Sequence, residues 1–158
     1  MQTINLSFIL LLISTFLLIF ILNFILRKKP LTQLQISFSS VLFCALILDI
    51  GVLVQNVCYK YFQMDPSPFE NFIYIGTCFL PVCLFFTALI FTKTKIYFKK
   101  SYLLLFIIPI LTLIMVWTNN YHHLFYKNYS LNLSEQTYGI YFTVHTIYTY
   151  GLLFISMA

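Results

Sequence analysis

The sequence predicts an all-α membrane protein, a polytopic bundle of five transmembrane helices with its N-terminus outside. Of its 158 residues, 61% are hydrophobic and only 8% are charged. In a soluble domain roughly a quarter of the residues are charged. A chain with so few charged residues has a surface suited to lipid and not to water. Aromatic residues make up 20% of the chain, in agreement with a membrane protein because Tyr and Trp favour the membrane boundary.

Five apolar runs are long enough to cross a membrane, because a helix needs about 20 apolar residues to span the hydrocarbon core. They cover residues 5–26, 34–57, 71–92, 101–119 and 139–158. The first run has no basic leader and no small-residue cleavage site, so we interpret it as a spanning helix and not as a signal peptide. The connections are short and no internal repeat is visible, which predicts a single transmembrane domain over residues 1–158.

Two prolines fall inside predicted helices. Pro81 lies in the third run and Pro109 in the fourth. Proline removes a backbone N–H and kinks a helix, which membrane proteins tolerate when a neighbouring group satisfies the freed carbonyl. We therefore expect helix kinks at these two mid-helix positions.

Basic residues predict how the chain is threaded through the bilayer. The first and third connections contain "RKK" (27–29) and "KTKIYFKK" (93–100), which hold seven of the nine Lys and Arg residues. The second and fourth connections hold only Lys60 and Lys127. Since short cytoplasmic loops are enriched in Lys and Arg, the first and third connections are expected in the cytoplasm, with the chain spanning the cell membrane several times.

This orientation makes the fifth helix run inward. It reaches the expected cytoplasmic edge at Ala158, and no Lys or Arg follows to anchor that end. We therefore expect the chain to be the front part of a longer protein.

The basic clusters do not indicate nucleic acid, although the net charge is +5. They are confined between long apolar runs, where they suit anionic lipid head groups, so membrane lipid is the expected partner. The cysteines show neither a CxxC pair nor metal spacing, so we expect buried thiols at Cys44, Cys58, Cys78 and Cys83, of which all but Cys58 fall inside apolar runs. The alternative is a Cys58–Cys78 disulfide near the outer face.

A metal site or cofactor is not expected either. His122 and His123 are adjacent, and adjacent helical side chains point about 100° apart. No third histidine lies nearby in the sequence, and the nearest acid is Glu135.

Two ionisable residues lie within predicted spans, where a charge costs about 2.5–3.5 kcal/mol on insertion scales. Asp49 lies about 12 Å below the outer end of the second helix, and His145 about 9 Å inside the fifth, at 1.5 Å per residue. Their similar depth allows an Asp49–His145 pair, either an ion pair or a neutral hydrogen bond. The alternative is that each is satisfied separately by a neighbouring hydroxyl or backbone carbonyl.

Polar rings on the fifth helix suggest a site in the outer half of the bundle. Tyr141, His145 and Tyr148 follow spacings of four and three residues, so they share one helical face. That face should point to the bundle interior, either to line a ligand cavity or to pack against neighbouring helices. The predicted signal pocket contains Asp49, Asn119, His122, Tyr141, His145 and Tyr148. No catalytic residue is assigned.

The segment "WTNNYHHLFYKNYS" (117–130) precedes this helix at the outer interface. Aromatic side chains favour this boundary, so they are expected to anchor the chain there. The expected anchors are Trp117, Tyr121, Phe125, Tyr126 and Tyr129.

Three segments resemble a known family. "FIYIGTCFLPVCLFFTALIFTKTK" (72–95), with its mid-helix proline and basic exit, resembles the third helix of the seven-helix membrane region at the N-terminus of many bacterial sensor histidine kinases. "IIPILTLIMVWTNNYHHLFY" (107–126) is similar to the fourth helix, and "YGIYFTVHTIYTYGLL" (138–153) to the fifth. The resemblance implies two further helices and a cytoplasmic output domain, most often a dimeric kinase and sometimes a cyclic-dinucleotide synthase, and hence a homodimer of the full-length protein.

A sensory input module of a two-component receptor is the leading hypothesis. An unknown small ligand or membrane stimulus would bias two helix arrangements and shift a helix toward the output domain. The chain holds no phospho-acceptor segment and no nucleotide-binding glycine motif, so we predict that it is not itself an enzyme.

Two other functions fit the sequence less well. A fragment of a small transporter or channel is the alternative, although transporters tend to show inverted repeats and broken helices. An intramembrane enzyme would need several catalytic or metal-binding groups at one depth, and one Asp and one His are too few.

Overall fold

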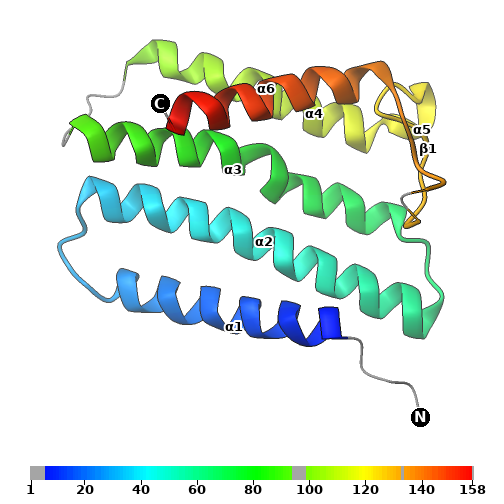
Figure 1. Cartoon of the computed structure of the whole chain (residues 1–158), viewed down its shortest axis with the longest axis horizontal. Helices are drawn as coiled ribbons and strands as arrows, with labels where there is room; N and C mark the ends of the chain where they lie inside the picture. Colours follow the sequence, from blue (N-terminus) through cyan, green and yellow to red (C-terminus); the bar gives the residue numbers. More distant parts are fainter. Residues whose placement is uncertain (1–5, 94–98, 133, 158) are drawn as a thin grey trace. The chain divides into compact units, whose positions relative to one another are not determined.

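The computed structural model describes residues 6–93, 99–132 and 134–157, and nearly all of its elements are helices (Figure 1). Lys95, one of the basic residues used to predict the orientation, lies outside the described residues. The helices are α1 (Leu6–Leu26), α2 (Gln33–Phe62), α3 (Ser67–Lys93), the 3₁₀ helix η1 (Lys100–Phe106), α4 (Ile107–Trp117), α5 (Asn119–His122) and α6 (Ile140–Met157). Two antiparallel strands that the sequence did not predict, β1 (Tyr126–Asn128) and β2 (Thr137–Tyr138), lie between α5 and α6.

Five helical segments are long and apolar enough to cross a membrane. They are Leu6–Leu26, Gln33–Phe62, Ser67–Lys93, Lys100–Trp117 and Ile140–Met157. Each coincides with one predicted run, so the all-α polytopic bundle is confirmed. The side of the membrane that the N-terminus faces stays a prediction.

The chain divides into two compact units, Met1–Thr77 and Cys78–Ala158, with the boundary inside α3. The first unit contains α1, α2 and the beginning of α3, and the second contains the rest of α3 and every element after it. The expectation of a single domain stays a prediction.

In the first unit, α2 begins and ends at residues that satisfy its terminal backbone groups. Thr32 and Gln35 form a capping box: the Gln35 N–H donates to Thr32 Oγ1 (3.2 Å), and the Thr32 N–H donates to Gln35 Oε1 (2.9 Å). At the other end Gln63 has a left-handed φ of 51°, and the N–H groups of Gln63 and Met64 both donate to the Cys58 carbonyl. These caps set where the connection from α1 ends and where the connection to α3 begins.

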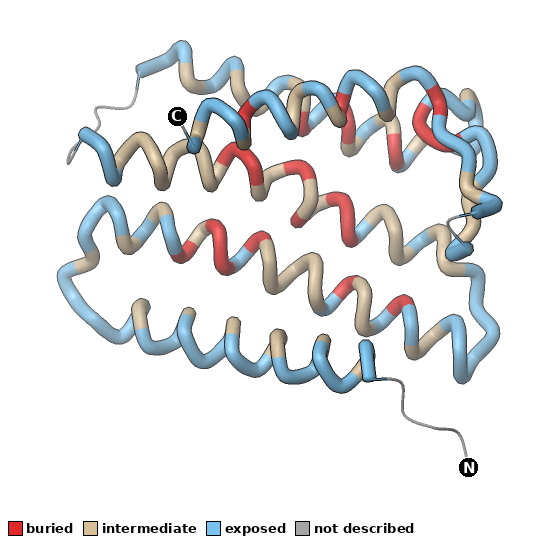
Figure 2. Tube along the Cα trace, viewed as in Figure 1, coloured by how far each residue is buried: buried red, intermediate tan, exposed pale blue. Residues whose placement is uncertain are grey.

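Both neighbours of α2 in this unit pack against it, but in different ways. α1 contacts α2 and has no buried residue of its own (Figure 2). The beginning of α3 approaches α2 much more closely: a Cβ added at Gly76 would lie 2.5 Å from the Cys44 carbonyl oxygen. Glycine is needed here because only a residue without a side chain lets the two backbones come so near.

The connection from α2 to α3 is held by side-chain hydrogen bonds. The buried Gln55 amide donates from Nε2 to the Pro66 carbonyl (3.1 Å) and to Glu70 Oε2 (3.3 Å). Asp65 Oδ1 accepts from the N–H (3.0 Å) and the hydroxyl (2.7 Å) of Ser67, the first residue of α3. The start of α3 is therefore fixed both to α2 and to its own connection.

In the second unit, aromatic rings attach η1 to the end of α3. The Phe86 ring lies 5.4 Å from Tyr102 in an edge-on arrangement and 6.2 Å from Phe106 in a stacked one, measured between centroids. Phe79 also contacts Phe106, at 6.1 Å. Edge-on and offset ring pairs of this kind add to the stability gained from burying their surface.

The fourth span differs from the uninterrupted helix that the sequence predicted. It starts as the 3₁₀ helix η1, and Pro109 is the third residue of α4, so its predicted mid-helix position is corrected to the junction of the two segments. Pro109 has no N–H to donate to the Leu105 carbonyl, four residues earlier. The Tyr148 hydroxyl donates to that carbonyl instead. Pro81 lies inside α3 as predicted.

The hydrogen bonds of Asp65 make the start of α3 sensitive to pH. The N–H of Ser67, and then its hydroxyl, hold the pKa of Asp65 below its ordinary value. A carboxyl with a lowered folded pKa stabilises the structure above its unfolded pKa of about 3.9, and this contribution is lost as the pH falls through the lower folded value. We therefore predict a falling protection factor for the Ser67 amide below about pH 4 in hydrogen exchange.

The variant Asp65→Ala should show the same low protection already at neutral pH. Protection of the Gln35 amide, which is capped by Thr32 and not by a carboxylate, serves as the internal control. Full protection of Ser67 in Asp65→Ala at neutral pH would contradict this assignment.

Candidate functional site

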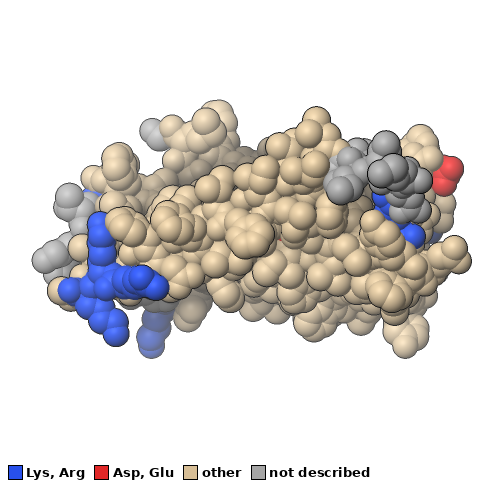
Figure 3. All heavy atoms as spheres, turned by 90° about the horizontal axis from the view of Figure 1, so that it is seen from below, with Lys and Arg blue, Asp and Glu red and all other residues tan. Residues whose placement is uncertain are grey.

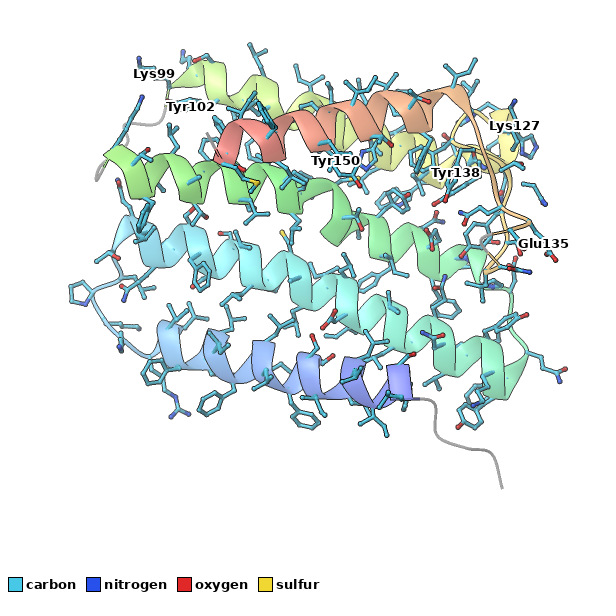
Figure 4. All side chains as sticks on the ribbon, in the orientation of Figure 1. Lys99, Tyr102, Lys127, Glu135, Tyr138 and Tyr150 are labelled. Atoms are coloured by element: carbon cyan, nitrogen blue, oxygen red, sulfur yellow. The ribbon has the colours of Figure 1, made fainter. Side chains whose placement is uncertain are left out.

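The segment between α4 and α6 folds around the ring of Phe125, whose side chain is fully buried. Its centroid lies 5.0 Å from Tyr126, 5.5 Å from Phe142, 6.0 Å from His145 and 6.4 Å from Tyr141. Tyr138, labelled in Figure 4, stacks on Phe142 at 3.9 Å and contacts Tyr126 at 5.8 Å. We call this group the aromatic cap: Phe125, Tyr126, Tyr138, Tyr141, Phe142 and His145.

Asn119 holds the chain of the cap in place. Its Oδ1 accepts from the N–H groups of Phe125 and Tyr126, both at 3.0 Å. Its Nδ2 donates to the Tyr126 carbonyl, also at 3.0 Å. One amide thus satisfies three backbone groups next to the buried ring, which is the reason for an Asn at this position.

His122 forms the turn that brings the chain back toward α6. Its Nδ1 accepts from the Leu124 N–H (3.0 Å), so the ring proton lies on Nε2, which is 3.0 Å from Thr118 Oγ1. The Thr118 hydroxyl in turn donates to the Ile114 carbonyl (2.6 Å). Both ring nitrogens of His122 are therefore used in local structure.

The cap closes onto α6 at Gly139. The Gly139 N–H donates to the Phe125 carbonyl (2.8 Å), and the Tyr141 N–H donates to the Leu124 carbonyl (3.0 Å). A Cβ at position 139 would lie 2.0 Å from the Leu124 carbonyl oxygen, closer than any side chain permits. Glycine is required at this contact between two backbone segments.

Tyr141 and His145 share the face of α6 that the sequence predicted, and both rings lie against Phe125. His145 is 5% exposed. In the described structure, this face of α6 therefore packs against the ring of Phe125.

Tyr148, the third residue of that predicted face, has a different partner. Its hydroxyl donates to the Leu105 carbonyl, which Pro109 leaves without an α-helical donor. Membrane helices with an internal proline need such a substitute. Tyr148 therefore joins α6 to η1, one helical turn away from the cap.

Asp49 lies in the first unit, where α1 supplies its partner. The Ser14 hydroxyl donates to Asp49 Oδ2 at 2.5 Å. This contact matches the alternative in which a neighbouring hydroxyl satisfies the carboxyl. Because His145 belongs to the second unit, an Asp49–His145 pair stays a prediction.

The structure thus gathers four of the six predicted pocket residues, Asn119, His122, Tyr141 and His145, around the cap. The central residue, Phe125, was assigned to the membrane boundary instead. Phe125 and Tyr126 are 0% and 5% exposed, so for these two residues that assignment was wrong.

Of the other predicted anchors, Trp117 and Tyr121 are 54% and 90% exposed and Tyr129 is partly exposed, so their position at the membrane boundary stays a prediction. Phe125 and Tyr126 are buried because the turn at His122 reverses the chain and the Asn119 side chain binds the N–H groups of both residues.

Within the described ranges, no group of three His, Cys, Asp or Glu side chains is arranged to hold a metal ion. All four cysteines are free thiols: Cys44 and Cys78 are buried as predicted, whereas Cys58 and Cys83 are partly exposed, so the prediction of burial was wrong for these two. The aromatic cap is held together by its ring contacts and by the hydrogen bonds of the Asn119 amide.

Five spanning helices joined by short connections, one of which carries the cap, define a multi-pass membrane protein. The family model described as the N-terminal 7TM region of histidine kinase matches residues 10–158. The chain belongs to this family, as the resemblance predicted. No curated protein and no solved structure gives a significant match to it. The family is a sensor region for signal transduction and not a catalytic domain.

We predict that Gly139→Ala destabilises the protein and Gly151→Ala does not. The new methyl group at position 139 would overlap a backbone carbonyl, and overpacking of this kind costs about 1–3 kcal/mol. A Cβ at Gly151 meets nothing within 4 Å, and Ala favours a helix over Gly by about 1 kcal/mol. Thermal unfolding in detergent measures both effects, and equal melting temperatures for the two variants would contradict the cap closure.

We also predict that Ser14 and Asp49 are energetically coupled. Hydrogen bonds between membrane helices contribute about 0.6 kcal/mol on average and up to about 1.7 kcal/mol. A double-mutant cycle with Ser14→Ala and Asp49→Ala, measured by unfolding in mixed micelles, should give a coupling free energy in this range. Strictly additive effects would contradict the contact; Thr15→Ala, whose hydroxyl bonds within α1, should be additive with Asp49→Ala.

Proposed function

We propose that these residues form the signal-input part of a two-component histidine-kinase receptor in the bacterial plasma membrane. The family match over residues 10–158 is the observation that carries this proposal. The phosphotransfer chemistry would belong to a separate output domain, and the receptor would act as a homodimer. Membrane lipid would surround the five helices.

The charges support an orientation with the N-terminus and the aromatic cap outside. Arg27, Lys28 and Lys29 connect α1 to α2, and Lys99 and Lys100 lie at the start of the fourth span. Connections rich in Lys and Arg remain in the cytoplasm. The cap then lies at the outer face, where a small ligand or a change in the membrane can reach it.

The contacts of Phe125 support a route by which such a stimulus would act. Phe125 lies in the connection between α4 and α6, and its ring contacts His145 one and a half turns into α6. A stimulus that displaces this ring would change the packing of α6 without breaking the backbone bonds at Gly139. Packed interfaces respond to such a change by switching between two arrangements, which produces a helix shift of about 1–2 Å.

The residues expected to respond are those of the cap together with Asn119 and His122. Tyr148 and Asp49, also predicted for the pocket, would act indirectly, by holding α6 to η1 and α1 to α2.

In a receptor that joins this region to its kinase output domain, we predict that Phe125→Ala and His145→Ala each change basal autophosphorylation. Each variant removes the ring contact between the connection and α6. Typical coupling between sites changes an equilibrium by about 5–150-fold, so a change of at least about fivefold is expected. The measurement uses purified receptor in lipid vesicles.

Ile147→Ala is the matched control, because this side chain is on α6 and 69% exposed. It should leave the output unchanged. Unaltered autophosphorylation in both cap variants would contradict the proposal, and solute flux through the same vesicles would favour the transporter alternative instead.

A further inference from the structure

A stripe of exposed phenylalanines runs along α1 and ends at a basic cluster. Phe16, Phe20 and Phe24 are 72%, 70% and 57% exposed. Their four-residue spacing puts them on one face of the helix. Lys28 is the next position in this series, and its Nζ lies 4.5 Å from the centroid of the Phe24 ring.

The basic cluster consists of Arg27, Lys28 and Lys29, which are all exposed. In Figure 3, seen from the side of α1, blue side chains gather at one end and the surface beside them is tan. The Lys28 side chain points toward the aromatic stripe, so its ammonium lies over the Phe24 ring. The aliphatic part of a lysine covers apolar surface in this way while its charge stays at the membrane interface.

The dimensions of the stripe match one half of a bilayer. The eight residues from Phe16 to Phe24 rise about 12 Å along the helix. One leaflet contributes about 15 Å of hydrocarbon. An acyl chain whose head group lies at Arg27–Lys29 would therefore run beside all three rings.

The cluster is far from the carboxylates of its own unit. Asp49 lies 16 residues after Gln33, the first residue of α2, which is about 24 Å along the helix axis. Asp65 and Glu70 come after the opposite end of α2. Within residues 6–77, which the structure describes without a gap, no Asp or Glu therefore lies at the end of the unit that carries these three cations.

We propose that this surface of α1 is a binding site for an anionic diacyl phospholipid. Arg27, Lys28 and Lys29 would bind the phosphate and head group, since Arg in particular forms paired hydrogen bonds with phosphate oxygens. Phe16, Phe20 and Phe24 would lie along one acyl chain, where rigid rings offer a large apolar surface. The alternative is a basic cluster that is only hydrated. That alternative explains neither the adjoining row of phenylalanines nor the position of Lys28 over the Phe24 ring.

The site is tested by lipid quenching of a tryptophan placed inside it. Trp117, the single tryptophan of the chain, is replaced by Phe, and Phe20→Trp supplies the reporter. The protein is reconstituted with phosphatidylglycerol or phosphatidylcholine carrying brominated acyl chains. We expect stronger association of the anionic lipid at position 20, reduced about fivefold by Lys28→Gln, the effect of one interfacial cation.

Phe154→Trp on α6 is the matched control reporter, because this position is 76% exposed and has no Lys or Arg nearby in the sequence. It should show no preference between the two lipids. Equal association of both lipids at position 20, or the same preference at both positions, would overturn the proposal.

A second measurement leaves the basic cluster intact, so it does not depend on how Lys28→Gln folds. Rising salt should remove the preference for phosphatidylglycerol at position 20, because exposed charges are screened. Inorganic phosphate has similar charge chemistry but no acyl chain, so at constant ionic strength, with phosphate replacing chloride, it should not displace the lipid. Displacement by inorganic phosphate, or a preference unaffected by salt, would also overturn the proposal.

Discussion

The dryness of the membrane interior is the constraint on which the rest of this structure depends. Polar groups within the spans need protein partners, since the hydrocarbon core offers no water. Threonine hydroxyls inside the helices meet this need by donating to the carbonyl four residues earlier, as at Thr15, Thr77, Thr87, Thr112 and Thr146. Longer-range hydrogen bonds, such as those of Ser14 with Asp49, Gln55 with Glu70 and Tyr148 with Leu105, connect separate helices and so also determine how those helices pack.

The same requirement explains how an irregular connection can be compact between two spans. The chain from Asn119 to Gly139 contains a turn, a short hairpin and a buried ring. Its backbone groups beside Phe125 bond to the Asn119 amide and to the start of α6. Because these bonds surround Phe125, the aromatic cap is attached to α6 both through the backbone and through the rings of Tyr141 and His145. A local change in the cap is therefore a change in the packing of α6.

The sequence predicted the five spans, because length and apolar composition alone decide whether a helix can cross lipid. It also predicted the shared face of Tyr141 and His145, which follows from helical spacing. It did not predict Phe125 at the centre of the site or the hairpin, since both depend on the turn at His122 and on the contact at Gly139. Nor did it predict the Leu105 partner of Tyr148, because spacing gives the depth of a residue and its helical face but not the neighbour opposite. Asn119, six residues before Phe125, and Gly139, just before α6, indicate the aromatic cap only once the turn at His122 is known.

The proposed role of the aromatic cap in signal input depends most directly on which face of the membrane carries it. Cysteine labelling in intact cells tests this in a protein whose four native cysteines are replaced. Tyr121→Cys reports on the segment beside the cap, where the native side chain is 90% exposed, and Lys29→Cys reports on the connection from α1 to α2. A membrane-impermeant maleimide should label position 121 in intact cells and position 29 only after lysis. The opposite result would put the cap in the cytoplasm and contradict its role at the outer face.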